Sequence, residues 1–214
     1  MNKNLSKRIA SIINLTSANE YIYDLCCDHG EIGLGIYEKF KTNPEFKELI
    51  FNDQVSSICS KLKDKITSIY SYIPMNINIQ EGPCGLINFK ENSTIIIVGV
   101  GYDTVKSILD KLPKHAELII SSHTKPLEMR QLLSSKLKLK EELLVYENKQ
   151  FYEILKLDTY KGQEIPKIGN FTKNEQYQLY LEQLASHFKL KATYGNDTFS
   201  KEILKIIELK QKEF

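Results

Sequence analysis

The stretch YIYDLCCDHGEIG, residues 21–33, decides the fold: an apolar segment runs into a tight polar turn and then into a helical pattern. In proteins that alternate strands and helices, such a turn lies at the carboxyl edge of the sheet. Backbone N–H groups there bind nucleotide-like ligands. The stretch therefore predicts a ligand site of this kind, and an ordinary connection between a strand and a helix is the alternative.

The chain continues the same alternation. Residues 94–98 are almost purely β-branched, which is typical of a central parallel strand buried on both faces. A helix capped by Ser56 follows the second strand, and a hairpin turns at Asn148-Lys149. The periodicity predicts a mixed sheet of about seven strands. We expect strands at 21–25, 49–52, 77–80, 94–98, 116–121, 143–147 and 151–157, and helices at 5–15, 31–40, 56–72, 103–112 and 126–135.

A polar connector follows the hairpin. Residues 161–170 contain Gly162, Pro166 and Gly169, and beyond them apolar residues recur at helical spacing over 171–190 and 198–214. The simplest interpretation is an α/β domain over residues 1–160 and a helical hairpin over 161–214, with residues 193–197 as its turn.

Composition excludes several classes of protein. The 29 basic and 27 acidic residues leave a net charge of only +2, so a polybasic nucleic-acid binder is excluded. No apolar run approaches the roughly 18 residues of a membrane span, and we expect a cytoplasmic protein without a membrane partner. The four cysteines have no CxxC spacing, so we expect no metal and no disulfide framework: Cys26, Cys27, Cys59 and Cys84.

Three loops of the predicted sheet carry residues suited to a ligand. Asp53 ends the second strand, where a carboxylate accepts hydrogen bonds from ribose hydroxyls or, alternatively, stabilises a helix N-terminus. Gly99 and Gly101 follow the central strand and let a ligand lie against the backbone. The first turn has Cys26 and Asp28 where a dinucleotide loop has glycine, which argues against a nicotinamide-dependent oxidoreductase.

Several of these segments resemble one known family, the bacterial tRNA adenine-22 N1-methyltransferases of the TrmK type. Residues 5–8 are similar to its opening LSKR, Asp28-His29 to the DH of its GSDH turn, and Met129-Arg130 to its LR. Further segments resemble its GEV, GNGL, AGMGG and NKVYEI motifs: residues 52–55, 82–86, 98–102 and 148–154. The resemblance covers roughly residues 5–157.

The resemblance implies a class I methyltransferase, with a Rossmann-like mixed seven-stranded sheet and a C-terminal helical hairpin. It also implies S-adenosylmethionine as cofactor and tRNA as substrate. The residues expected around the cofactor are Asp24, Cys26, Asp28, His29, Asp53, Gly82, Gly85, Gly99 and Gly101. We expect Asp53 to hold the ribose and His29 to fix the turn.

The catalytic side is where the chain departs from the family. Asp28 is the expected carboxylate near the charge that builds on the purine or near the methionine amino group; a turn carboxylate capping the next helix is the alternative. Ser121-Ser122-His123 stands where the family has QPN, so His123 is expected to hold the base, unless it is a solvent-facing histidine. Tyr102 is expected to stack on the adenine or to fill the space of a missing glycine.

Cations near the expected edge are candidates for tRNA contacts, with solvated helix faces as the alternative: Lys7, Arg8, Lys125 and Arg130. Two functions remain open at this point. One is methylation of adenine N1 in tRNA, and the other is a non-catalytic module that binds S-adenosylmethionine or RNA on the same fold. The sequence leaves open whether the protein is a monomer or a weak dimer.

Overall fold

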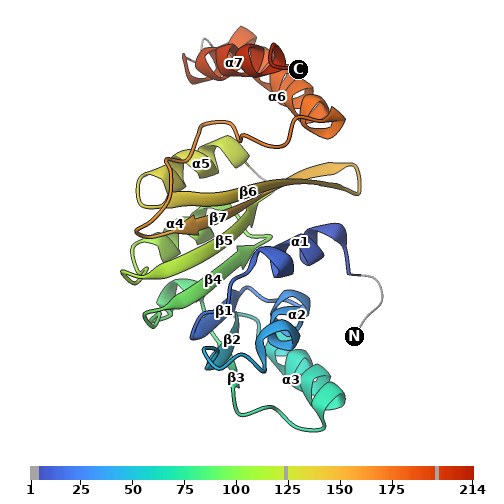
Figure 1. The fold of residues 1–214 in the computed structure, drawn as a ribbon, viewed down its shortest axis with the longest axis vertical. Helices are drawn as coiled ribbons and strands as arrows, with labels where there is room; N and C mark the ends of the chain where they lie inside the picture. Colours follow the sequence, from blue (N-terminus) through green and yellow to red (C-terminus); the bar gives the residue numbers. More distant parts are fainter. Residues whose placement is uncertain (1–4, 123–124, 196–197) are drawn as a thin grey trace.

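The computed structural model describes residues 5–122, 125–195 and 198–214. They form one seven-stranded sheet in the order β3-β2-β1-β4-β5-β7-β6, in which β7 alone is antiparallel to its neighbours on both sides (Figure 1). This is the predicted Rossmann-like methyltransferase topology. The strands are β1 (Tyr21–Leu25), β2 (Glu48–Asp53), β3 (Ile77–Glu81), β4 (Ser93–Val98), β5 (Ala116–Ser122), β6 (Lys138–Glu147) and β7 (Gln150–Asp158).

Helices cover both faces of the sheet. One face carries α1 (Lys7–Leu15), α2 (Glu31–Phe40) and α3 (Ser56–Tyr70), and the other carries the 3-10 turn η1 (Cys84–Leu86), α4 (Tyr102–Leu109) and α5 (Pro126–Ser134). Successive strand residues point to opposite faces. Thus Ile22 packs in the core under α1, α2 and α3, whereas Tyr23 packs in the core under η1, α4 and α5. The β-branched residues Ile95, Ile96 and Ile97 are fully buried, as a central parallel strand requires.

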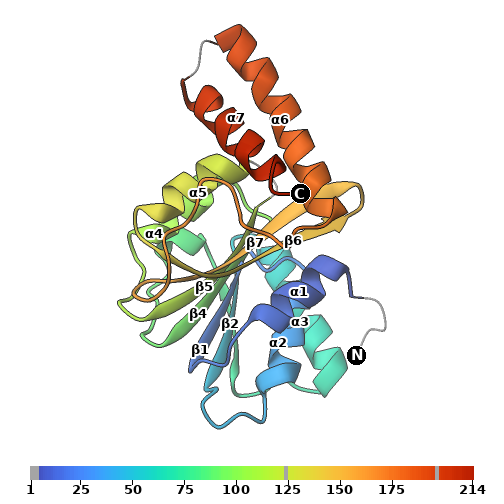
Figure 2. The ribbon, with the colours of Figure 1, turned by 45° about the horizontal axis from the view of Figure 1, so that its top comes forward.

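The C-terminal helices α6 (Glu175–Gly195) and α7 (Thr198–Gln211) lie side by side at one end of the molecule, beyond β6 (Figure 2). Their core includes Leu181, Ile203 and Ile207, all fully buried, and it extends to Leu127 of α5. The helical pair therefore shares a hydrophobic core with the α/β domain.

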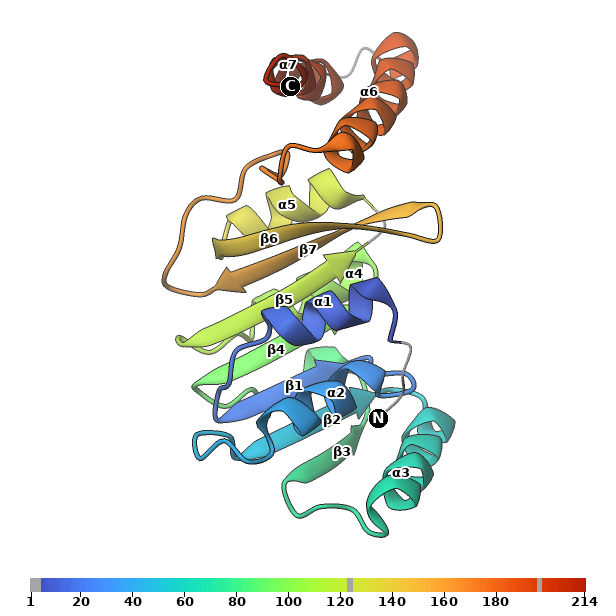
Figure 3. The ribbon, with the colours of Figure 1, turned by 45° about the vertical axis from the view of Figure 1, so that its right-hand side comes forward.

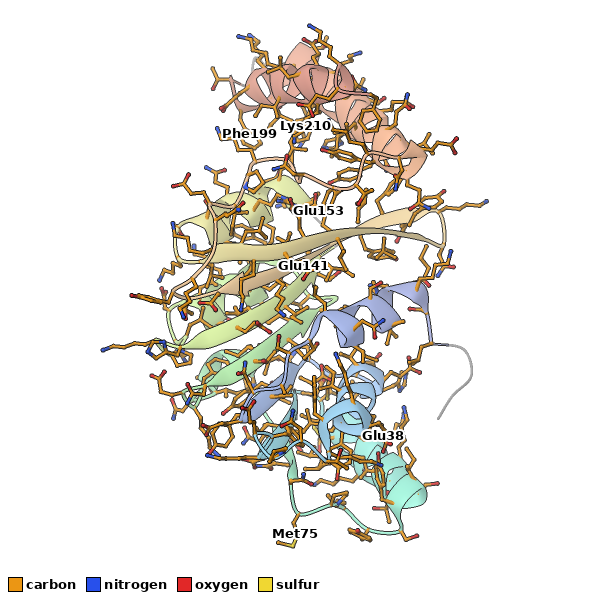
Figure 4. The ribbon with its side chains drawn as sticks, in the orientation of Figure 1. Glu38, Met75, Glu141, Glu153, Phe199 and Lys210 are labelled. Carbon is orange, nitrogen blue, oxygen red and sulfur yellow. The ribbon has the colours of Figure 1, made fainter. Side chains whose placement is uncertain are left out.

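A buried arginine links this pair to the sheet. Arg130 of α5 is 1% exposed, and its Nε donates to Glu153 Oε2 at 2.7 Å while its Nη2 donates to Glu142 Oε2 at 2.6 Å. Tyr180 of α6 donates to the other Glu153 oxygen at 2.6 Å. In Figure 4, Glu153 and Lys210 lie where the helical pair meets the sheet. Arg130, expected to contact tRNA, is enclosed by two carboxylates and cannot reach a phosphate.

The N-terminal helix is held by the last two strands. The Lys7 N–H donates to Glu147 Oε1 at 2.7 Å, the Arg8 guanidinium lies 4.6 Å from the Tyr152 ring centroid, and Lys156 Nζ donates to the Leu15 carbonyl at 3.0 Å. Figure 3 shows α1 lying over one face of the sheet. We call this set of contacts the α1 clasp.

Several predicted boundaries are wrong: α4 ends at Leu109 rather than at 112, and α6 covers Glu175–Gly195 rather than 171–190. Helix α3 begins at Ser56 as predicted, but its N-cap is Val55 rather than a serine, and Asp53 Oδ1 accepts the Val55 N–H at 3.0 Å. Strand β6 begins at Lys138, five residues before the predicted start, and a bulge between Leu139 and Glu141 interrupts the alternation that sequence patterns rely on. The predicted 193–197 turn is helical up to residue 195.

Candidate functional site

The carboxyl ends of the parallel strands bring the predicted loops together. In register, Leu25 of β1 faces Asn52 of β2 on one side and Ile97 of β4 on the other. The turn that starts at Cys26 therefore lies between the end of β2 and the loop after β4. The structure thus brings the three loops to one edge, which is the crevice where open α/β sheets bind ligands.

A buried carboxylate anchors the first turn. Asp24 is 3% exposed, and its Oδ2 accepts the Gly33 N–H from the first turn of α2 at 2.9 Å. A Cβ on Gly33 would lie 2.7 Å from Asp24 Oδ2 and 2.3 Å from Phe51, so only glycine permits this approach. Burial raises the pKa of Asp24 to about 7, the Gly33 N–H opposes that rise, and the Asp53 charge adds to it.

Two residues of the turn that are not glycine adopt a backbone conformation that glycine normally occupies. Cys26 and Asp28 have φ of 53° and 46°, in the left-handed region that costs a side chain roughly 1 kcal/mol. Asp28 and His29 are mainly exposed, with 3.7 Å between Asp28 Oδ1 and His29 Nε2. Both side chains therefore face outward at the rim, and among the described residues no hydrogen bond joins the His29 ring to the backbone.

Asp53 organises the second loop. This side chain is 7% exposed, and its Oδ2 accepts the Asp28 N–H at 3.3 Å while its Oδ1 accepts the Val55 N–H at 3.0 Å. Asp53 thus both stabilises the start of α3 and fixes the first turn. A carboxylate has about four acceptor positions, so both oxygens retain capacity for ligand hydroxyls.

The four glycines expected near the cofactor differ in the space around them. A Cβ built on Gly82, Gly99 or Gly101 meets nothing within 4 Å, so these three border open space. Gly82 and Gly99 also have φ of 139° and 77°, which disfavours any side chain. A Cβ on Gly85 would instead lie 3.0 Å from Ser107 Oγ of α4. Gly85 therefore packs closely against α4, and its contact with a ligand stays a prediction.

Two polar atoms outside the expected site residues also lie at this edge. Asn52 Oδ1 and Ser121 Oγ are buried, and among the described residues neither has a hydrogen-bond partner. The Asn52 amide is fixed by its Nδ2, which donates to the Gly82 carbonyl at 2.9 Å, and the Ser121 carbonyl accepts the Gly99 N–H at 3.1 Å. The signal available in sequence was position, since each polar residue directly follows a run of apolar strand residues, 49–51 and 118–120.

A depression of ≈ 410 Å³ lies beside the edge, between the start of α4 and α5. It is lined by Tyr102, Lys125, Glu128, Gln131 and Leu132. Tyr102 is half-buried, and Lys125, exposed with φ of 49°, is the residue before α5. The structure therefore brings two predicted residues together at one hollow. His123 lies outside the described residues.

The remaining cations expected to contact tRNA differ in their exposure to solvent. Lys7 is exposed, whereas Arg8 is half-buried against Tyr152. In the described part of the chain, no cluster of three or more histidine, cysteine or acidic side chains could hold a metal ion. None of the described helices has the length and apolarity needed to cross a membrane.

Comparison with known proteins gives the family and the fold. Residues 5–155 match the family model described as "Methyltransferase domain". No curated protein sequence matches the chain. The chain is similar in structure to Mycoplasma capricolum TrmK in complex with S-adenosyl-homocysteine: TM-score 0.74, 20% identity, 98% of this chain and 97% of that one.

Two further structures are similar over nearly the whole length. Bacillus subtilis TrmK, an M1A22 tRNA methyltransferase, gives a TM-score of 0.68 at 18% identity, with 99% of this chain and 97% of that chain covered. A Streptococcus agalactiae protein of the NADB-Rossmann superfamily gives 0.75 at 18% identity, with 99% of each chain covered. At these identities the likeness establishes the fold.

Proposed function

The chain belongs to the methyltransferase-domain family, and from this we propose that it transfers a methyl group from S-adenosylmethionine to adenine N1 in tRNA. The observation that carries the proposal is the match of residues 5–155 to the family model, together with one sheet edge that joins Asp24, Asp53 and three open glycines. The full-length likeness to two TrmK proteins, including the C-terminal helices, supports tRNA as the substrate.

The residues at the edge fit this cofactor. Backbone at Gly82, Gly99 and Gly101 is open to a close-lying ligand, and Asp53 retains acceptor capacity for ribose hydroxyls. The unpartnered Asn52 Oδ1 offers an additional acceptor at the same edge. Carboxylates also suit a ligand that carries ammonium and sulfonium charges, because an opposite charge stabilises the ionised form of a buried acid such as Asp24.

The chain's own residues would contribute mainly alignment and charge. Bound S-adenosylmethionine supplies an electrophilic methyl group, and the neutral N1 lone pair of adenine needs no base to remove a proton. We assign Asp53 to the ribose and the exposed Asp28 carboxylate to the positive charge that builds on the purine. Tyr102 borders the hollow beside the edge, where an unstacked base would stack on its ring.

We include the partner and the location in the same proposal. Exposed Lys7 and Lys125 flank the edge and would contact phosphates in a salt-dependent way. A cytoplasmic location agrees with a tRNA substrate and with four cysteines that are all unpaired.

The test is methyl transfer itself. Purified protein is incubated with labelled S-adenosylmethionine and tRNA from a strain that lacks the modification, and nucleosides are analysed by mass spectrometry. We expect 1-methyladenosine, with a loss of about 10²-fold in Asp28→Ala and normal turnover in the surface variant Lys167→Met. Cofactor binding by calorimetry without any methylated product would instead support a non-catalytic binding module.

A further inference from the structure

Two cysteines from distant parts of the sequence meet at the cofactor edge. Cys26 directly follows β1 and is half-buried, whereas Cys84 is the first residue of η1 and is 7% exposed. Both belong to the same hydrophobic cluster, and neither is in a disulfide. Sequence spacing gives no hint of the pair, because 58 positions separate the two residues (84 minus 26).

Hydrogen bonds through β2 fix the two loops relative to each other. The Cys27 N–H donates to the Asn52 carbonyl at 3.1 Å, and the Asn52 side chain donates to the Gly82 carbonyl at 2.9 Å. The Gly82 N–H in turn donates to the Asp53 carbonyl at 2.9 Å. The loops that carry the two thiols are therefore held as neighbours by the sheet.

The pKa values of the two thiols are shifted in opposite directions. The Cys26 thiol hydrogen-bonds Cys84, and this contact, with the Gly85 and Cys84 N–H groups, lowers the pKa of Cys84 to about 7 against the opposing effects of burial and of Asp53. The same hydrogen bond, together with burial, raises the pKa of Cys26. Burial raises the pKa of Cys27 and of Cys59. The lowered pKa favours the Cys84 thiolate, which is the nucleophilic form, whereas the raised pKa values of the other three cysteines disfavour theirs.

We propose that Cys26 and Cys84 form an oxidative modification site, at which a peroxide converts the two thiols into a disulfide that lowers cofactor affinity. The Cys84 thiolate attacks one peroxide oxygen, the O–O bond breaks, and the released hydroxide takes up a proton to give water. The Cys26 sulfur then attacks the resulting sulfenic acid and releases a second water. Two thiols lose two electrons, and hydrogen peroxide gains them.

Disulfide formation affects cofactor binding because it shortens the distance between the two sulfur atoms. A disulfide holds the two sulfurs about 2.05 Å apart, much closer than two hydrogen-bonded thiols. Its formation draws the turn after β1 toward the loop after β3, and both loops border the edge at which the cofactor is proposed to bind. This part of the inference depends on the proposed function, whereas formation of the disulfide does not.

The experiment measures the cross-link directly. Wild-type protein is treated with hydrogen peroxide, alkylated and cut with trypsin, which places Cys26 and Cys27 in residues 9–39, Cys59 in 48–61 and Cys84 in 66–90. We expect a disulfide-linked pair of peptides 9–39 and 66–90 that dithiothreitol separates. The cross-link persists in Cys27→Ala and Cys59→Ala and is lost in Cys26→Ser and in Cys84→Ser.

Calorimetry with S-adenosylhomocysteine then tests the regulation, with about tenfold weaker binding after oxidation and recovery after reduction. Absence of the linked peptides, a link through Cys27, or over-oxidation of Cys84 alone would overturn the proposed site. A link that leaves affinity unchanged overturns the regulation. If reduced protein binds no cofactor but the link still forms, the proposed function fails and the modification site stands.

Discussion

Replacing Arg130 with methionine tests whether the buried ion cluster holds the C-terminal helices on the α/β domain. The substitution leaves Glu142 and Glu153, 8% and 5% exposed, without their cationic partner. Removing one member of a buried pair costs about 3–5 kcal/mol, because the remaining charge stays desolvated. At about 2–4 °C per kcal/mol for a chain of this size, the melting temperature should fall by about 6–20 °C.

The matched control is Lys167→Met, which breaks the Lys167–Glu202 pair with both side chains 50% exposed and should cost less than about 1 kcal/mol. Differential scanning calorimetry gives the stabilities, and hydrogen exchange should show lost protection first in α6 and α7. Adding Glu142→Gln and Glu153→Gln to Arg130→Met should recover part of the loss. Equal effects of Arg130→Met and Lys167→Met, or no recovery in the triple variant, would refute the reasoning.

The remaining predictions concern the ligand edge. Gly33→Ala should destabilise the fold by about 1–3 kcal/mol in thermal melts, because the added Cβ would lie 2.3 Å from Phe51. Gly101→Ala adds a Cβ in open space, so it should leave stability unchanged and weaken cofactor binding. Burial raises the pKa of Asp24 to about 7, so the folded state holds more protons than the unfolded state between about pH 4 and 7. Stability of the ligand-free protein should therefore fall as pH rises through that window; urea melts across pH should show no such slope for Asp24→Asn. Asp53→Asn should weaken cofactor binding about 10–100-fold by calorimetry, and an unchanged affinity would remove its role at the ribose.

Sequence patterns predicted the elements that local rules govern. The β1 and α2 boundaries agree with the structure, because an apolar strand, a turn and an amphipathic helix follow one another without interruption. The start of β6 was missed, because a bulge shifts the alternation and only Leu139 and Val145 of this strand are buried. The cap of α3 was missed because Asp53, three residues before Ser56, supplies the acceptor.

The site was predictable only in part. The sequence shows where a residue lies along a strand, but it does not show which distant side chains will contact that residue in the fold. Asp24 and Asp53 could be placed at the edge from the strands that end near them. From the sequence, Arg130 is expected to be a surface cation, because no local pattern indicates that Glu142 and Glu153 of the next hairpin contact it. The meeting of Cys26 with Cys84 is likewise a product of sheet order.

The α1 clasp has a consequence for the order of folding during synthesis. Helix α1 leaves the ribosome before its partners Glu147, Tyr152 and Lys156, which emerge about 140 residues later. At 5–20 residues per second, that delay lasts roughly 7–28 seconds. Throughout it, the apolar face of the nascent helix lacks the strands that will support it, and final docking of the first segment waits for nearly the whole domain to be translated.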